Sequence, residues 1–253
     1  MKLQEITDWL DQALNVAAFD DVSNNGLQIA RDGADVTTVA FAVDASARAV
    51  KAAKDAGAQL LVVHHGISWG GGIRRLSGGV YQVVRAAMDA NIALYACHLP
   101  LDAHPALGNN AQLAKLMGMG KPRPAFSYHG NVIGFVGACP RKTILKGLAS
   151  LGCAAPQIDA WTKAQSRTLT LGVCSGGAGE FAEEAKRLGC DLYLTGEANW
   201  GDVIAAQNCG MPMICAGHYE TEVFGVRAVS RELQKALKLR TVDLTPIQSL
   251  REL

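Results

Sequence analysis

The stretch LLVVHHGISWGGG, residues 60–72, decides the fold, because it joins an apolar run to two adjacent histidines and a glycine-rich bend. Residues 60–63 are the short, continuous apolar run that is typical of a buried strand. Neighbouring side chains on a strand point to opposite faces, so His64 and His65 need a special reason to stand together. Ligands of parallel α/β sheets bind at the carboxyl ends of the strands. The stretch therefore predicts a strand of an α/β sheet that ends in a functional site.

Strand and helix patterns alternate before and after this stretch, and the second half of the chain repeats the scheme. Such alternation is typical of β–α–β units, which build largely parallel or mixed sheets. The predicted fold class is therefore α/β. The expected strands are 36–44, 58–65, 92–99, 167–177, 190–196 and 211–219, and the expected helices between them are 45–57, 78–91, 178–189 and 201–210.

The two halves also match each other without a gap. A shift of 120 residues lays IALYACHLPLD, from residue 92, over PMICAGHYETE, from residue 212. This shift places His98 on His218 and Asp102 on Glu222, so that two His-x-x-x-acid pairs coincide. Such self-similarity indicates an internal duplication.

We therefore expect two similar, intertwined α/β lobes, residues 1–125 and 126–253, with the functional site in the cleft between them. The divide is expected within GKPRPAFSYHGN, residues 120–131, where prolines and polar residues gather.

The composition fits a compact soluble protein. Hydrophobic residues make up 49% and charged residues 19% of the 253 residues. Basic and acidic residues number 24 and 23, and the formal net charge of +1 argues against a nucleic-acid partner. No apolar stretch is long enough to span a bilayer, and residues 1–14 have the pattern of an acidic amphipathic helix instead of a signal peptide. The seven cysteines form no CxxC pair, and we expect buried, reduced thiols without a catalytic role in a cytoplasmic protein.

Histidines and acids gather at the predicted strand ends. A lone histidine at such a place is more often a hydrogen-bonded core or rim residue than a ligand. Two adjacent histidines together with two matched His-x-x-x-acid pairs favour a metal site. This mixture of imidazoles and carboxylates suits Zn, Fe, Mn, Co or Ni, whereas Mg and Ca prefer oxygen ligands. The candidate residues are His64, His65, His98, Asp102, His218 and Glu222.

The two His-x-x-x-acid pairs differ in their local context. Pro100 interrupts the first pair, so we expect Asp102 on a loop. The second pair leads into a helical pattern over residues 223–238, so we expect His218 and Glu222 one turn apart on one helix face.

Adjacent histidines at a strand end suit a pair of metal ions. Past its last ladder bond a strand can twist, so that His64 and His65 flank a cleft and each binds a different ion, the two ions lying roughly 3.5–4 Å apart. Asp102 and Glu222 are the candidates for the negative bridging ligands that such a pair needs. The predicted cofactor is two divalent transition-metal ions per chain, which lower the pKa of water and supply hydroxide near neutral pH.

Several further features have two interpretations. Arg74 and Arg75 lie in a basic, glycine-rich loop and either steer a phosphate-bearing substrate or are solvated. Glu197, at a predicted strand end, is either a general base or a structural acceptor. The turn CSGGAGE, residues 174–180, either binds an anion with its amides or is glycine-rich for steric reasons. We expect His104 and His129 at the surface and Trp69 and Trp200 at the walls of the cleft.

Long motifs occur in a fixed order along essentially the whole chain. They are NNGLQIA (24–30), LLVVHHGISWGG (60–71), YACHLPLDAHPALGNNAQLAKLMG (95–118), GVCSGGAGE (172–180), DLYLTGEANW (191–200) and GHYETE (217–222). In these motifs the chain resembles the dinuclear-metal-centre family of GTP cyclohydrolase I type 2 homologues, also called NGG-interacting-factor-three-like proteins.

The resemblance implies a ligand set, a role for one further residue and an assembly. It places the metal ligands at His64, His65, Asp102, His218 and Glu222, none of which is substituted. His98 is the one candidate residue outside this ligand set, and we interpret it as a residue that orients a metal ligand or a water molecule without binding the metal. The resemblance also implies a toroidal homohexamer whose metal sites face a central cavity.

Two classes of function remain open. The first is a metal-dependent hydrolase of a small nucleotide or phosphate-bearing substrate, for which the family name suggests opening of the GTP purine ring by hydroxide attack at C8. The second is a non-enzymatic metal-binding ring scaffold, or a metal-delivery or regulatory protein. A family name alone does not decide between them.

Overall fold

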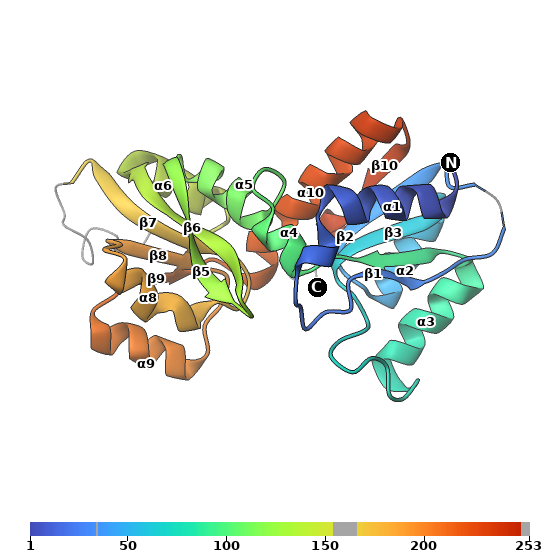
Figure 1. The fold of residues 1–253 in the computed structure, drawn as a ribbon, viewed down its shortest axis with the longest axis horizontal. Coiled ribbons are helices and arrows are strands. Elements are labelled where there is room, and N and C mark those ends of the chain that lie inside the picture. The colour runs from blue at the N-terminus through green and yellow to red at the C-terminus, as the bar shows by residue number, and fades with distance from the viewer. Residues whose placement is uncertain (34, 154–165, 249–253) are drawn as a thin grey trace. The chain divides into compact units, whose positions relative to one another are not determined.

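The computed structural model describes residues 1–33, 35–153 and 166–248, and the chain folds into two compact units (Figure 1). The first unit comprises Met1–Leu101 with Gly225–Leu253, and the second comprises Asp102–Phe224. The chain passes from the first unit to the second within helix α4 (Leu99–Ala103) and returns within helix α10 (His218–Leu237).

This division differs from the expected lobes, 1–125 and 126–253, for two reasons. The segment expected to join the lobes is strand β5 (Gly120–Tyr128), which forms an antiparallel hairpin with β6 (Asn131–Pro140) inside the second unit. Its prolines are tolerated because β5 is the edge strand of its sheet. The chain end also returns to the first unit, where β10 (Arg240–Asp243) pairs in parallel with β2 (Thr38–Asp44).

The first unit is built on a five-stranded mixed sheet with the order β1-β4-β3-β2-β10. Strands β2, β3, β4 and β10 are parallel neighbours, and β1 is antiparallel to β4. The bounds of the strands not yet given are β1 (Gly26–Ile29), β3 (Leu60–His65) and β4 (Ala93–Ala96).

Helices cover both faces of the first sheet (Figure 1). On one face, α2 (Ala47–Asp55) and α3 (Gly78–Ala90) pack against the alternate strand residues that include Leu61 and Val63. On the other face lies α1 (Leu3–Ala13), whose Asp11 accepts a hydrogen bond from the buried Tyr95 hydroxyl at 2.7 Å. A short 3-10 turn (Val16–Ala18) follows α1, and another (Thr245–Gln248) follows β10.

The second unit is built on a second five-stranded mixed sheet with the order β5-β6-β7-β8-β9. Strands β7 (Thr168–Cys174), β8 (Leu192–Thr195) and β9 (Met213–Cys215) run parallel, whereas β6 is antiparallel to both of its neighbours.

Helices cover this sheet on both faces as well (Figure 1). Helices α5 (Asn109–Leu116) and α6 (Arg141–Ser150) pack on one face around a buried core that includes Leu113, Ile144 and Leu171. On the other side of the sheet lie α8 (Ala182–Arg187), which follows a 3-10 turn (Gly179–Phe181), and α9 (Trp200–Cys209).

Both units contain the same β–α–β–α–β arrangement. In the first it runs β2-α2-β3-α3-β4, and in the second it runs β7-α8-β8-α9-β9, with the three strands parallel and adjacent in the same order. The α/β class is confirmed, and the strands and helices expected from the sequence are present with ends that differ by a few residues. The common arrangement is what an internal duplication requires, and in each unit it places the carboxyl ends of three parallel strands at one edge.

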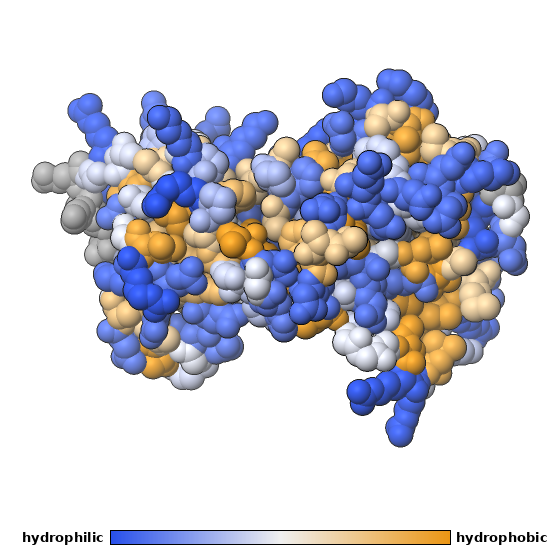
Figure 2. Space-filling view, in the orientation of Figure 1, coloured by the Kyte–Doolittle hydropathy of each residue, from blue (hydrophilic) through white to orange (hydrophobic). Residues whose placement is uncertain are grey.

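Some large hydrophobic side chains remain at the surface of the first unit. Figure 2 shows hydrophobic surface around α3, where Leu76 and Met88 are 56% and 68% exposed. Across the described ranges, every helix falls short of the length and apolarity that crossing a bilayer requires.

Candidate metal centre

Three histidines meet at the carboxyl ends of β3 and β4 in the first unit. His64 and His65 end β3, and His98 follows β4, so the parallel pairing of these strands brings the three rings together. One ring nitrogen from each lies within 4.8 Å of one from each of the others. The ring centroids of His64 and His65 are 4.5 Å apart, so adjacent side chains do converge at this strand end.

Each of these imidazoles is held through its Nδ1 atom. The His64 Nδ1–H donates to the carbonyl oxygen of Cys97 at 2.9 Å, which fixes its proton on Nδ1. His65 Nδ1 lies 2.8 Å from a carboxylate oxygen of Asp44, and His98 Nδ1 lies 2.9 Å from one of Asp21. With the proton on Nδ1, Nε2 carries the lone pair. Carbonyl or carboxylate partners of this kind are typical of metal-binding histidines.

Asp21 is ionised in this arrangement. Burial of its side chain opposes ionisation, but the hydrogen bonds from His98 and from the Ser23 amide outweigh burial and lower the pKa of Asp21 to about 2. A carboxylate that is charged at neutral pH therefore accepts the hydrogen bond from His98.

Two buried carboxylates lie close together in the second unit. Asp102 is on α4 and Glu222 is on the first turns of α10, and an oxygen of one lies within 4.8 Å of an oxygen of the other. Asp102 accepts hydrogen bonds from the Asn109 amide at 2.9 Å and the Ser175 hydroxyl at 3.1 Å. Like charges at this separation in a buried place repel, and a cation relieves that repulsion.

His218 lies beside Glu222, as the helical pattern predicted. The two residues are one turn apart on α10, and His218 Nε2 is 3.3 Å from a Glu222 carboxylate oxygen. The hydrogen bond to Glu222 raises the pKa of His218 to about 9 against the opposing effect of burial, and Glu197 adds to the increase. Without a metal, this imidazole is therefore the cation beside the carboxylate pair.

The expectation that Asp102 lies on a loop is wrong. Residues Leu99–Ala103 form the short helix α4, and Pro100 lies in its first turn. Proline fits there because the first amides of a helix have no intrahelical acceptor. Both His-x-x-x-acid pairs thus lie at the beginning of a helix that follows a parallel strand.

The glycine-rich turn after β7 packs tightly against these ligands. Gly176 has φ +66°, and a Cβ atom there would lie 2.3 Å from a Glu222 carboxylate oxygen. The Gly176 amide donates to the Thr221 hydroxyl, and the Ser175 and Ala178 amides have acceptors inside the unit. The structure therefore favours the steric explanation of this turn over an anion site.

The other residues singled out from the sequence differ in exposure and in their contacts with the histidines. Glu197 is 62% exposed and its carboxylate lies 3.2 Å from His218 Nδ1. Arg74 and Arg75 are exposed on the loop after β3. Trp69 packs on the rings of His65 and His98, whereas Trp200 is 76% exposed. His104 is partly buried and accepts amide hydrogen bonds in its own turn, and His129 is exposed at the β5–β6 turn.

Sequence reasoning missed the groups that hold the ligands: Asp21, Asp44, Asn109 and Ser175. A signal was present for three of them. Asp44 ends an apolar strand next to the His65 strand, Asn109 lies in the motif ALGNN, and Ser175 lies in the turn CSGGAGE. No comparable signal marks Asp21, because its contact with His98 joins segments 77 residues apart.

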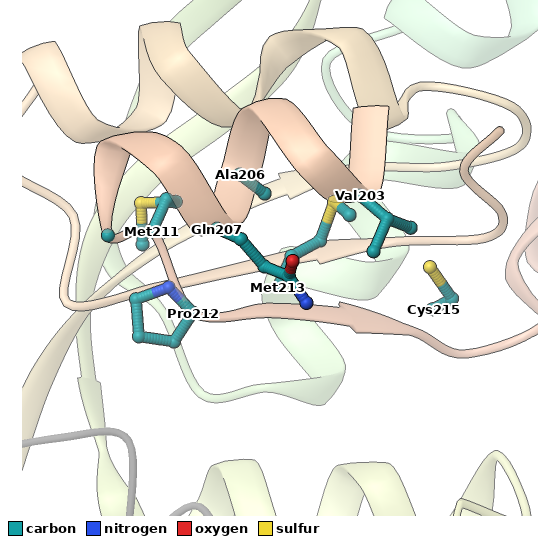
Figure 3. Close-up of a pocket in the computed structure, with 8 residues that line it drawn as sticks. Val203, Ala206, Gln207, Met211, Pro212, Met213 and Cys215 are labelled. Atoms are coloured by element: carbon teal, nitrogen blue, oxygen red, sulfur yellow. The ribbon is translucent and has the colours of Figure 1, made fainter. Parts of the chain in front are cut away.

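A separate pocket in the second unit lacks such chemistry. It has a volume of about 470 Å³ and lies between α9 and β9 (Figure 3). Its lining is apolar apart from the Gln207 amide and the Cys215 thiol. We do not assign it to the metal centre.

Two groups of side chains could hold a metal ion. The first unit supplies three imidazoles, and the second supplies an imidazole with two buried carboxylates. Cys174 lies outside these groups, and burial and the charges of Asp102 and Glu222 raise the pKa of its thiol well above the usual value.

Comparison with known proteins finds a matching family over nearly the whole chain. The model of the family described as Duf34/NIF3 (NGG1p interacting factor 3) matches residues 1–250. A protein of Pyrococcus horikoshii named GTP cyclohydrolase 1 type 2 homolog is 39% identical over 245 residues, covering 96% of this chain and 97% of the relative. The Deinococcus radiodurans protein of the same name is 38% identical over 244 residues, covering 91% and 88%.

Solved structures share the fold over nearly the whole chain. A structure described as protein ybgI, of unknown function, has a TM-score of 0.83 at 30% identity and covers 97% of this chain and 98% of its own. Reduced HcgD from Methanocaldococcus jannaschii has a TM-score of 0.77 at 26% identity, with 96% and 98% covered.

Proposed function

Because this chain belongs to the Duf34/NIF3 family, we propose that it is a metal-dependent hydrolase of a small, phosphate-bearing substrate. The observation that carries the proposal is the cluster of three imidazoles with Nδ1 atoms held by a carbonyl or carboxylate oxygen. That arrangement directs coordinating nitrogens toward one place, which a purely structural histidine does not need.

We propose that His64, His65, Asp102, His218 and Glu222 bind two divalent transition-metal ions, with Zn, Fe, Mn, Co and Ni as the candidates. His98 belongs to the imidazole group of the first unit, and we propose that it orients a ligand or a bound water molecule and does not itself bind metal. The proposed metal binding is supported by the composition of the two groups and by the repulsion between the buried carboxylates of Asp102 and Glu222.

A pair of divalent cations lowers the pKa of water and supplies hydroxide near neutral pH. The residues of the chain then have distinct tasks. Asp44 and the Cys97 carbonyl keep His65 and His64 in the coordinating tautomer. Asn109 and Ser175 fix the Asp102 carboxylate, so that it does not rearrange when charge changes nearby.

The proposed substrate is a purine nucleotide such as GTP, opened by hydrolysis at C8. The support is the name GTP cyclohydrolase 1 type 2 homolog carried by relatives that cover nearly the whole chain. Arg74 and Arg75 are the proposed contacts for the phosphates, since both are exposed on the loop that follows the paired histidines.

The test is hydrolysis of GTP and of a phosphate-ester panel by protein loaded with each candidate metal. His65→Ala is the test variant, and His129→Ala is the matched control because His129 is exposed and outside both donor sets. We expect turnover that requires metal, falls by at least roughly 100-fold in His65→Ala and is unchanged in His129→Ala. Tight metal binding without turnover of any substrate would assign the chain to the metal-binding or metal-delivery class instead.

We further propose that the chains assemble into a homohexamer in the cytoplasm. The exposed hydrophobic side chains Leu76, Met88 and Trp200 support an assembly, since such surface is commonly covered in oligomers. The seven free cysteines suit a reducing compartment. Light scattering on a sizing column tests the assembly, and a monomer mass at working concentrations would refute it.

A further inference from the structure

We propose that Asp21 and Asn25 position His98 in the metal centre. This inference rests on the proposed metal binding and assigns a task to the segment before β1, which carries no metal donor itself. His98 is the ring that both residues contact, and it lies with its centroid 5.1 Å from that of His64 and 5.7 Å from that of His65.

Asp21 accepts four hydrogen bonds, two on each oxygen. Its Oδ1 accepts from His98 Nδ1 at 2.9 Å and from the Ser23 amide at 3.0 Å. Its Oδ2 accepts from the Leu99 amide at 2.8 Å and from the Asn25 side chain at 2.9 Å. The side chain is only 2% exposed, so water does not replace a lost partner.

Asn25 completes the contact with His98. Its side-chain oxygen accepts the His98 backbone amide at 2.8 Å, while its side-chain nitrogen donates to Asp21. The ring of His98 and the backbone on both sides of its α-carbon are therefore held by residues 21–25. This fixes the tautomer with the proton on Nδ1 and directs Nε2 toward the rings of His64 and His65.

Only a carboxylate satisfies this arrangement at position 21. An asparagine there presents one oxygen and one NH2 group. Whichever way its amide is turned, the NH2 group faces two N–H donors, because each Asp21 oxygen accepts two hydrogen bonds. Asp21→Asn therefore disturbs His98 although it preserves the size of the side chain.

Asp44 provides a comparison within the same cluster, because it holds His65 as Asp21 holds His98. Its carboxylate oxygen lies 2.8 Å from His65 Nδ1, and its side chain is 48% exposed. Because about half of the Asp44 side chain is open to solvent, water can solvate a group that loses its partner there, whereas the buried Asp21 side chain has no such access to water. We therefore expect Asp44→Asn to weaken zinc binding less than Asp21→Asn does.

The test measures zinc affinity by competition with a chromophoric chelator, using the full chain. The variants are Asp21→Asn, His98→Ala, the double variant and Asp44→Asn. We expect Asp21→Asn to weaken zinc binding roughly 10- to 100-fold, the range seen when outer partners of a metal site are lost. In the His98→Ala background the same substitution should have no further effect, because Asp21 acts through His98.

Equal losses with and without His98 would overturn the inference, since they would show a general structural effect. Wild-type affinity in Asp21→Asn would overturn it as well. If Asp21→Asn does not fold, Asn25→Ala replaces it in the same cycle, and its effect must likewise vanish without His98. Failure of the wild-type chain to bind zinc would instead refute the proposed metal binding, so the two failures are distinguishable.

Discussion

Gly176→Ala should weaken metal binding more than its effect on folding explains. Gly176 follows β7, and its backbone lies against the carboxylate of Glu222. The added Cβ would lie 2.3 Å from Glu222 Oε1 and 3.3 Å from His218 Nε2. Because the nearest atom is the end of a flexible side chain, the carboxylate moves and the backbone does not.

The size of the effect follows from these distances. To reach ordinary contact the carboxylate oxygen must move by about 1 Å, whereas metal–ligand distances tolerate only about 0.2 Å. We therefore expect zinc affinity to fall by at least roughly 10-fold, or about 1.4 kcal/mol. Placing alanine at φ +66° costs a further 1–2 kcal/mol or so of folding free energy.

Gly189→Ala separates these two effects. Gly189 has a similar φ of +77°, but a Cβ atom there would meet no atom within 4 Å. Urea unfolding of the metal-free proteins should show similar losses for both variants, and chelator competition should show weakened zinc binding for Gly176→Ala alone. Wild-type zinc affinity in Gly176→Ala, or an equal loss in Gly189→Ala, would refute the reasoning.

Three further predictions concern titration, packing and thiol exposure. The Glu222 hydrogen bond raises the pKa of His218 from 6.5 to about 9. The protonated His218 therefore stabilises the folded chain fully below pH 6.5, and this contribution is lost as pH rises through 9. The Tm of chelator-treated protein should fall over that range, and His218→Gln should flatten the fall. Tyr95→Phe removes the hydrogen bond from the buried Tyr95 hydroxyl to Asp11. Because the acceptor is charged, the free energy of unfolding in urea should fall by about 1.5–3 kcal/mol. An unchanged urea midpoint would count against this hydrogen bond. Cys215 is the exposed cysteine, so a thiol reagent should label it before the other six. Partial burial raises the pKa of its thiol, so labelling should be faster at alkaline pH. Cys215→Ser should abolish this fast phase.

The sequence predicted the parallel core of each unit because its signals are local. Apolar runs bounded by glycine, such as residues 60–63, fix a strand wherever the rest of the chain lies. Ser46 marks the start of α2, where its hydroxyl accepts the Ala49 amide at 3.0 Å. The histidines at the ends of β3 and β4 could be found for the same reason, since parallel strands bring their carboxyl ends to one edge.

The errors arose where pairing partners lie far apart in the chain. Residues 120–131 have the composition of a linker, yet they form an edge hairpin whose turn residues His129 and Gly130 both have positive φ. The pairing of β10 with β2 joins residues about 200 positions apart and has no local signal. Asp21 was not predicted for the same reason, because only folding brings it into contact with His98.

The most direct test of the metal centre is anomalous scattering from crystals of the full chain grown with zinc or manganese. The account predicts two peaks per chain, each within coordinating distance of side chains from the set His64, His65, Asp102, His218 and Glu222. The absence of peaks at these side chains, or peaks only elsewhere, would contradict it.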